Sequence, residues 1–183
     1  MKNLGIIGFL GLVLFCCLGS TTPPFNNDDV ILVINKIEIK IKGKSTVGDY
    51  NCDNSLIKND SIFLNLNKKN SISAQIPMAA FDCKNRIMTK DLQSTVKVKK
   101  YPNSFVTISE IKPCAKNYRC NLTFAITDKT LKYKDFILKT SDNKIQGSFN
   151  LNFSDIGLEP PVKMGGLIKV KDEIVIDFTL YKN

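Results

Sequence analysis

The chain of 183 residues contains no histidine, the residue that most often serves as a general base or a zinc ligand. A catalytic triad built on histidine is therefore excluded. Zinc is disfavoured as well, because no CxxC pair is present and imidazole ligands are missing. With no nucleophile motif either, the sequence predicts no catalytic residue, no metal site and no cofactor.

Arginine is nearly as scarce, because Arg86 and Arg119 are the only two and lysine supplies the rest of a net charge of +9. Lysine lacks the planar fork with which arginine recognises phosphates and bases. These lysines also spread along the chain, whereas single-strand binders cluster them with exposed aromatic residues. We therefore expect no nucleic-acid partner. Peripheral attraction to anionic lipid head groups is the more plausible use of the charge.

One long apolar run is present, from Leu4 to Leu18, and it follows Lys2 and precedes the small residues Gly19 and Ser20. This pattern is typical of a secretory signal peptide. A membrane anchor is the alternative, but spanning needs about 20 apolar residues. The sequence predicts a signal peptide over residues 1–20, a short polar tether over 21–29 and one domain over 30–183.

Cys16 and Cys17 offer a second interpretation of the leader, in which a bacterial lipoprotein is cut just before a cysteine that then carries lipid. The residues that precede them, Phe15 and Cys16, fit that signal poorly. Either interpretation predicts location in the periplasm or cell envelope.

Of the six cysteines, two belong to the leader and four follow it: Cys52, Cys83, Cys114 and Cys120. An even number in an exported chain favours two disulfides, and three pairings are open. We prefer Cys114–Cys120, which would close a short loop across a strand connection, and this leaves Cys52–Cys83. Free buried thiols are the alternative.

Apolar and polar residues alternate through most of the remaining chain, which indicates strands with one buried face. Short polar turns separate them, among them Asn67–Asn70 and Ser141–Asn143. Regular spacing of this kind predicts an all-β antiparallel sandwich or barrel. The predicted strands are Ile31–Ile41, Leu56–Leu66, Ser71–Met78, Ser104–Ile111, Cys120–Ile126, Thr130–Lys139, Lys144–Phe153 and Ile174–Leu180.

One segment, Ile87–Val98, has helical spacing instead, and we expect Thr89 to cap its start. A second irregular segment precedes the last strand. Pro160 and Pro161 cannot continue a central strand, and Gly165 and Gly166 permit a close return of the backbone. We predict that this corner is the seam of a barrel that Ile174–Leu180 closes.

Three segments, taken together and in order, resemble the YceI-like family over about Ile37 to Tyr181. They are GKSTVGDYNC (residues 43–52), IPMAAFDCKNRIMTKDLQSTVKVKKYPNSFVTISEI (76–111) and SDIGLEPPVKMGGLIKVKDEIVIDFTL (154–180). The resemblance implies an eight-stranded antiparallel lipocalin-like barrel with one short helix, exported to the bacterial envelope. It also implies binding of a polyisoprenoid or another long-chain amphiphile inside the barrel.

The chain departs from the family pattern at two places. Residues 121–129 read NLTFAITDK, where the family often has two glycines, and Gly48-Asp49-Tyr50 stands where a tryptophan and a histidine are common. The fold tolerates such changes, whereas the shape of a cavity depends on them. The identity of the ligand therefore does not follow from the resemblance.

The candidate ligand-binding residues are mostly aromatic and belong to the expected inner faces. A filled core is the alternative, and the protein would then be a structural or interaction barrel with a protein partner. A homodimer is a further possibility. The expected lining is Phe63, Phe105, Phe124, Phe149, Leu151, Ile176 and Phe178, and the head-group candidates are Lys90, Lys97 and Lys99, whose alternative is ordinary solvation.

Overall fold

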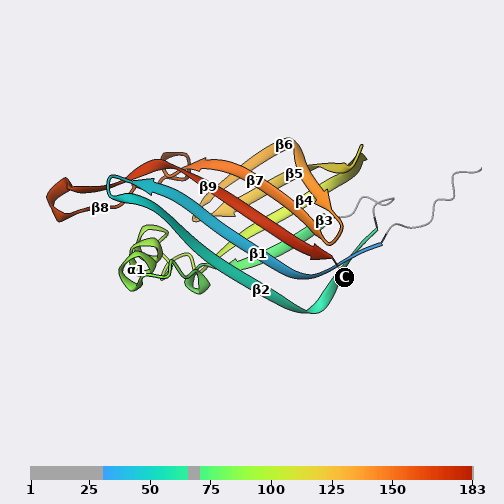
Figure 1. The fold of residues 1–183 in the computed structure, drawn as a ribbon, viewed down its shortest axis with the longest axis horizontal. Helices are drawn as coiled ribbons and strands as arrows, with labels where there is room; N and C mark the ends of the chain where they lie inside the picture. Colours follow the sequence, from blue (N-terminus) through green and yellow to red (C-terminus); the bar gives the residue numbers. More distant parts are fainter. Residues whose placement is uncertain (1–30, 66–70, 183) are drawn as a thin grey trace, which may run out of the picture.

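The computed structural model describes residues 31–65 and 71–182, with side chains for 33–56 and 71–182. The predicted leader, tether and turn at 67–70 lie outside these residues. Eight long antiparallel strands form one curled sheet in the order β2-β1-β9-β7-β6-β5-β4-β3 (Figure 1). This confirms the predicted all-β barrel. The strands are β1 (Ile31–Ser45), β2 (Gly48–Asn65), β3 (Ser71–Pro77), β4 (Asn103–Cys114), β5 (Asn117–Ile126), β6 (Lys129–Ser141), β7 (Lys144–Asn152) and β9 (Ile168–Lys182).

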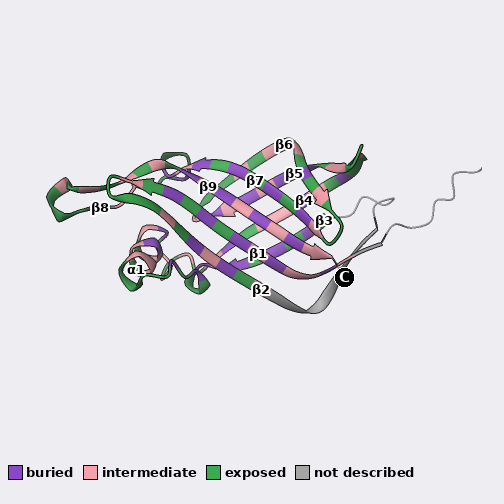
Figure 2. Cartoon of the chain, in the orientation of Figure 1, coloured by how far each residue is buried: buried purple, intermediate pink, exposed green. Residues whose placement is uncertain are grey.

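Buried and exposed side chains alternate along the strands, and the buried ones form a core inside the curled sheet. In β3, the side chains of Ile72, Ala74 and Ile76 are buried, whereas the serines and the glutamine between them are exposed. The same alternation of buried and exposed residues runs across the sheet in Figure 2. Because a slip of one residue would turn each buried row outward, the alternation fixes the register. Each large apolar side chain buried in this way contributes about 1.5–3 kcal/mol.

Two of the register shifts in the sheet fall at residues with positive φ. Glu110 has φ 53° where the β4–β5 register shifts, and Asp135 has φ 54° where the β5–β6 register shifts. A bulge adds one unpaired residue and increases the local twist of its strand. Beyond Asp135, β6 pairs with β5 over residues 136–138 and then with β7 over residues 139–141. The bulges therefore help to turn a flat sheet into a curl.

Strand β9, the last of the chain, lies between β1 and β7 in the sheet and pairs with both. β9 is therefore a central strand of the sheet. The predictions that it closes the barrel and that the corner before it is the seam are both wrong, because the two edge strands of the sheet are β2 and β3.

The corner after β7 builds a projecting arm instead of the seam. Within it, η2 (Ser154–Ile156) precedes the two prolines, and β8 (Val162–Lys163) pairs with the start of β9. Met164, Gly165 and Gly166 between them all have positive φ, which turns the chain back on itself. This arm extends beyond the barrel (Figure 1).

The predicted helix is present as α1 (Arg86–Thr95) and follows the short helix η1 (Met78–Ala80). The predicted cap is wrong, because Asn85 Oδ1 accepts hydrogen bonds from the backbone N–H groups of Ile87 and Met88 at 2.9 and 3.2 Å. Asparagine is among the preferred N-cap residues. Within residues 31–65 and 71–182, no helix is long and apolar enough to cross a membrane.

Candidate functional site

The barrel encloses a narrow apolar cavity of about 60 Å³. Its wall is built from the inner faces of β1, β3, β4, β5, β7 and β9, and from α1 at one end. Among the lining residues that the structure describes, Ser104 is the only one with a polar side chain. The lining consists of Ile37, Ile39, Ile41, Ile72, Ala74, Ile76, Met78, Phe81, Leu92, Val96, Ser104, Val106, Ile108, Phe124, Ile126, Phe149, Leu151, Phe153, Ile156, Ile174, Ile176, Phe178 and Leu180.

Most of the predicted lining residues do face this cavity: Phe124, Phe149, Leu151, Ile176 and Phe178. The side chain of Phe63 lies outside the described residues. The prediction for Phe105 is wrong, because its side chain is 51% exposed. Its neighbours Ser104 and Val106 line the cavity, so alternation along β4 turns Phe105 to the outer face.

Aromatic rings form one wall of the interior. The Phe124 and Phe149 ring centroids lie 5.6 Å apart in an edge arrangement, and Phe136 stacks on Phe178 at 6.1 Å. Tyr133 lies 5.0 Å from Phe149, and burial raises the pKa of its hydroxyl, with Asp155 adding to the shift. Such pairs stabilise by about 0.5–1.5 kcal/mol beyond their burial. This wall is therefore firmly packed.

The sequence interpretation missed the aliphatic part of the lining. Three isoleucines of β1, three residues of β3, Leu92 of α1 and Val96 at its C-cap all reach the cavity. Their alternation and helical spacing were visible in the sequence and could have identified them. The interpretation favoured aromatic residues, whereas a cavity wall is defined by strand face, not by residue size.

Near α1 the two edge strands are fastened to each other. Cys52 of β2 forms a disulfide with Cys83, which confirms that pairing. Asp53 and Asp82 exchange backbone hydrogen bonds of 2.8 and 2.9 Å, and Asn54 Nδ2 donates to the Pro77 carbonyl at 3.1 Å. We call these contacts the seam clasp.

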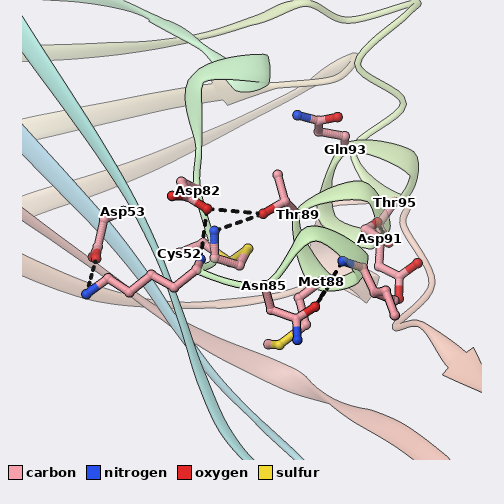
Figure 3. Close-up of a disulfide and its surroundings, with 12 residues drawn as sticks. Cys52, Asp53, Asp82, Asn85, Met88, Thr89, Asp91, Gln93 and Thr95 are labelled. Carbon is pink, nitrogen blue, oxygen red and sulfur yellow. Dashed lines mark hydrogen bonds and ion pairs between the residues drawn. A yellow bond between two sulfur atoms is a disulfide. The ribbon is translucent and has the colours of Figure 1, made fainter.

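The clasp also holds the helix (Figure 3). The Thr89 hydroxyl of α1 accepts a hydrogen bond from the Cys83 N–H at 3.0 Å and donates to Asp82 Oδ1 at 3.4 Å. Lys84 forms an ion pair with Asp53 at 3.7 Å. Because Leu92 of the same helix and its C-cap residue Val96 line the cavity, the clasp positions the side chains that close this end.

The predicted Cys114–Cys120 disulfide is absent, and both cysteines are free thiols. Cys114 pairs with Asn117 in the hairpin, so Cys120 lies three residues further along β5. At about 3.3 Å per residue, that separation is roughly 10 Å, beyond the roughly 7 Å between Cα atoms that a disulfide can bridge. Burial raises the pKa of the Cys120 thiol to about 11.

The head-group candidates are not brought to the cavity. Lys90, Lys97 and Lys99 are all exposed, the first on α1 and the others just after it. The helix turns Leu92 and Val96 toward the interior, and Lys90 two residues before Leu92 lies on another face. Their predicted role in holding a head group stays a prediction.

A larger depression of about 880 Å³ lies on the outside of the sheet, over β1, β2, β7 and β9 and beside β6. Charged residues on it pair with one another: Lys42 contacts Asp177 at 2.6 Å, and Lys40 contacts Asp53 at 3.6 Å. It is therefore a polar surface, unlike the interior, and it does not offer a continuous apolar path to a hydrocarbon chain.

An antiparallel barrel of eight strands around an apolar interior is an architecture that can hold one small hydrophobic ligand. The chain belongs to the YceI-like domain family, whose model matches residues 34–181. This confirms the family predicted from the three segments.

Two solved structures share the fold at low sequence identity. BcnA of Burkholderia cenocepacia is 13% identical with a TM-score of 0.58, and the match covers 80% of this chain and 96% of BcnA. A polyisoprenoid binding domain from Saccharophagus degradans, implicated in plant cell wall breakdown, is 11% identical with a TM-score of 0.55, covering 85% and 98%. No curated protein matches the sequence significantly.

Proposed function

We propose that this chain is an exported protein of the bacterial envelope that binds a long-chain amphiphile, of polyisoprenoid or fatty-acid type, inside the barrel. It would act as a carrier or sequestering protein and not as a catalyst. The observation that carries the proposal is the apolar lining, which extends over six strands and the helix with Ser104 as its one polar member among the described residues.

Hydrocarbon gains about 0.8 kcal/mol for each CH₂ removed from water, so a lining of this kind favours an extended apolar chain. Membership in the YceI-like domain family supports the same ligand class, as does the similar fold of a polyisoprenoid binding domain. Export is supported by the Cys52–Cys83 disulfide, because disulfides persist in oxidising compartments. The leader at 1–20 and lipid attachment at Cys16 or Cys17 remain part of this proposal.

The size of the cavity sets a condition on the mechanism. A volume of about 60 Å³ is well below the roughly 300–1,000 Å³ of typical ligand pockets. A long chain therefore enters only if interior side chains move apart. Met78 and the two α1 side chains at the clasped end are suited to this, because methionine is flexible and fills irregular gaps.

The same small volume favours a second candidate function, that of a structural or interaction barrel with a filled interior. The two functions differ in what the purified protein carries. We propose native mass spectrometry of protein isolated from its own host, followed by lipid extraction and by addition of prenyl and fatty ligands. A bound amphiphile is expected. Recovery of no lipid, together with no uptake of either ligand, would favour the filled barrel.

A matched pair of variants makes this test specific to the interior. Ala74→Leu adds bulk to a buried residue of the cavity wall, and we expect ligand uptake to fall while the circular dichroism of the sheet is kept. Ala125→Leu makes the same change between two inward-facing residues, Phe124 and Ile126, so it points away from the cavity. Equal uptake by both variants would contradict binding inside the barrel.

A further inference from the structure

The most exposed large apolar side chains gather at one end of the molecule. Among the described residues, seven large hydrophobic side chains are exposed, and the five with the highest exposed fractions lie on α1, the β1–β2 turn and the β8 arm. We call these five the apolar tip: Val47 (70% exposed), Ile87 (70%), Val162 (57%), Met164 (70%) and Leu167 (73%).

Direct contacts hold these three segments together. The Thr46 hydroxyl donates to the Leu167 carbonyl at 2.8 Å, and the Thr46 N–H donates to the Lys169 carbonyl at 3.0 Å. Lys163 forms an ion pair with Asp91 of α1 at 2.8 Å. Ile87 lies one helical turn before Asp91 on the same face. The β1–β2 turn, the helix and the arm also share one end of the barrel in Figure 1.

The exposure of the arm is built into its backbone. Met164 has φ 51° although it is not glycine, and such a conformation is uncommon for a residue with a side chain. The turn is closed by a hydrogen bond from the Leu167 N–H to the Met164 carbonyl at 3.3 Å and by one from the Val170 N–H to the Pro161 carbonyl at 3.1 Å. Met164 and Leu167 are thus held in solvent by an ordered turn, and not by a loose loop.

Positive charge surrounds the tip. The β1–β2 turn with its flanks and the arm, residues 44–49 and 159–171, carry four lysines and two acidic residues. Lys163 is engaged by Asp91, whereas Lys44, Lys169 and Lys171 are exposed beside the apolar side chains. Projecting apolar side chains flanked by lysines are suited to a bilayer interface that contains anionic lipids.

We propose that the apolar tip docks on an anionic lipid bilayer. Val47, Met164 and Leu167 enter the interfacial layer, and the flanking lysines contact the head groups. This docking places the end of the barrel that Leu92 and Val96 close next to the membrane. Its purpose, the exchange of an amphiphile with the bilayer, rests on the proposed function, but the docking itself does not.

The absence of tryptophan from the chain allows a direct test, because one introduced tryptophan is then the only indole reporter. We expect the emission of the Leu167→Trp variant of the full chain to shift to shorter wavelength with vesicles of phosphatidylcholine and phosphatidylglycerol. Ile137→Trp is the matched control, because Ile137 is an exposed apolar residue of β6 outside the tip. Its emission should not shift. The leader is common to both variants, so it cannot create a difference between them.

Reversal of charge tests the role of the lysines. With Leu167→Trp as the reporter, Lys44→Glu and Lys169→Glu should each lower the affinity for these vesicles at least about fivefold, the expected effect of losing one lysine near an anionic surface. Lys112→Glu, near the opposite end of β4, should change it little. Equal binding to vesicles of phosphatidylcholine alone would overturn the assignment to anionic lipid.

Three other results would overturn the proposal: no shift at position 167, an equal shift at position 137, or a shift without vesicles that grows with protein concentration. The last would mean that a second copy of the chain covers the tip. The vesicles contain no prenyl chains. Failure of ligand uptake would therefore leave the docking result intact, and failure of docking would leave the ligand result intact.

Discussion

The two sides of the barrel are held together in different ways. On one side, β9 forms long hydrogen-bonded ladders with both β1 and β7. On the other side, within the residues that the structure describes, β2 is joined to β3 and to the segment after it only through the seam clasp, in which the Asp53–Asp82 bridge is the one backbone pairing. The first side, which we call the ladder side, is a continuous hydrogen-bonded sheet. On the second side, two strand edges lie next to each other and are linked only near α1.

This difference indicates where the barrel can widen. Opening the β9 side would break a row of backbone hydrogen bonds, and a buried unpaired backbone group costs about 1–3 kcal/mol. Separating β2 from β3 beyond the clasp breaks none of the ladders that the structure describes. A narrow interior that must accept a long chain would therefore expand along the β2–β3 edge.

The largest expected effect comes from removing the disulfide of the clasp. The Cys52→Ala, Cys83→Ala double variant opens a loop with a sequence separation of 31. On the chain-entropy model, this lowers the free energy of unfolding by roughly 3 to 4 kcal/mol. Denaturant unfolding gives the size of the effect. Hydrogen exchange shows which strands are affected. The amide protons of β2 and β3 should lose protection, whereas those of β9 should stay protected.

Cys114→Ala is the matched control for this variant, because Cys114 is a partly exposed free thiol. Its effect on the free energy of unfolding should stay within about 0.5 kcal/mol. Equal loss of protection in β9 and in β2 after removal of the disulfide would contradict the difference between the two sides.

The next largest effect should occur on the ladder side, at Gly147 of β7. A Cβ placed on this glycine would collide with the Phe178 ring and would lie 2.8 Å from the Phe136 ring. Gly147→Ala must therefore displace stacked rings, and overpacking of this kind costs about 1–3 kcal/mol. Thermal unfolding of Gly147→Ala, Phe178→Leu and the double variant measures the coupling. The glycine substitution should cost less once the ring is absent, and an unchanged cost would contradict the close packing.

The strand faces were predictable wherever alternation ran without interruption. Ile174, Ile176 and Phe178 are buried as their spacing predicted. The pattern fails at Asp135, because Leu131 and Tyr133 share a face that would turn Phe136 outward. The bulge at Asp135 instead lets Phe136 stack on Phe178. No residue type in this segment signals a bulge, so the aromatic wall could not be completed from the sequence.

Features that depend on contacts between distant segments were harder to predict. The prolines and glycines of the corner correctly indicated a break before β9. The same residue types occur both in a barrel seam and in a projecting arm, so they could not distinguish the two. The cysteine count left three pairings open, and the choice of Cys114–Cys120 failed because strand register sets the distance between those residues. The cavity volume was not predictable either, because it depends on how interior side chains pack.

A smaller effect is expected at Asn54 in the clasp, where only one side-chain hydrogen bond is lost. Asn54 is 4% exposed and donates to the Pro77 carbonyl at 3.1 Å. Asn54→Ala removes this donor, and we expect the free energy of unfolding to fall by about 1–3 kcal/mol, toward the lower end because the Pro77 carbonyl is near the edge. Asn51→Ala, at an exposed position of the same strand, is the control. A loss at Asn51 as large as that at Asn54 would show that the hydrogen bond does not fasten the seam.

The smallest effect should be a pH-dependent one on the ladder side, at Asp177. Partial burial opposes ionisation of its carboxyl group, but Lys42 of β1 and Ser148 of β7 bind the carboxylate, and the net result is a pKa below the ordinary 3.8. Because the folded-state pKa is the lower one, this contribution is present above pH 3.8 and is lost as the pH falls through the folded-state value.

Asp177→Asn should therefore lower the free energy of unfolding at neutral pH by less than about 1 kcal/mol, since the pair is partly exposed. The difference from the unmodified chain should shrink as the solution is acidified below pH 3.8. Denaturant unfolding at several pH values measures it, with Asp142→Asn in the exposed β6–β7 turn as the control for a general loss of negative charge. If the two substitutions gave the same pH profile, the contacts of Asp177 with Lys42 and Ser148 would contribute nothing to the free energy of unfolding. Backbone pairing alone would then hold β1, β9 and β7 together.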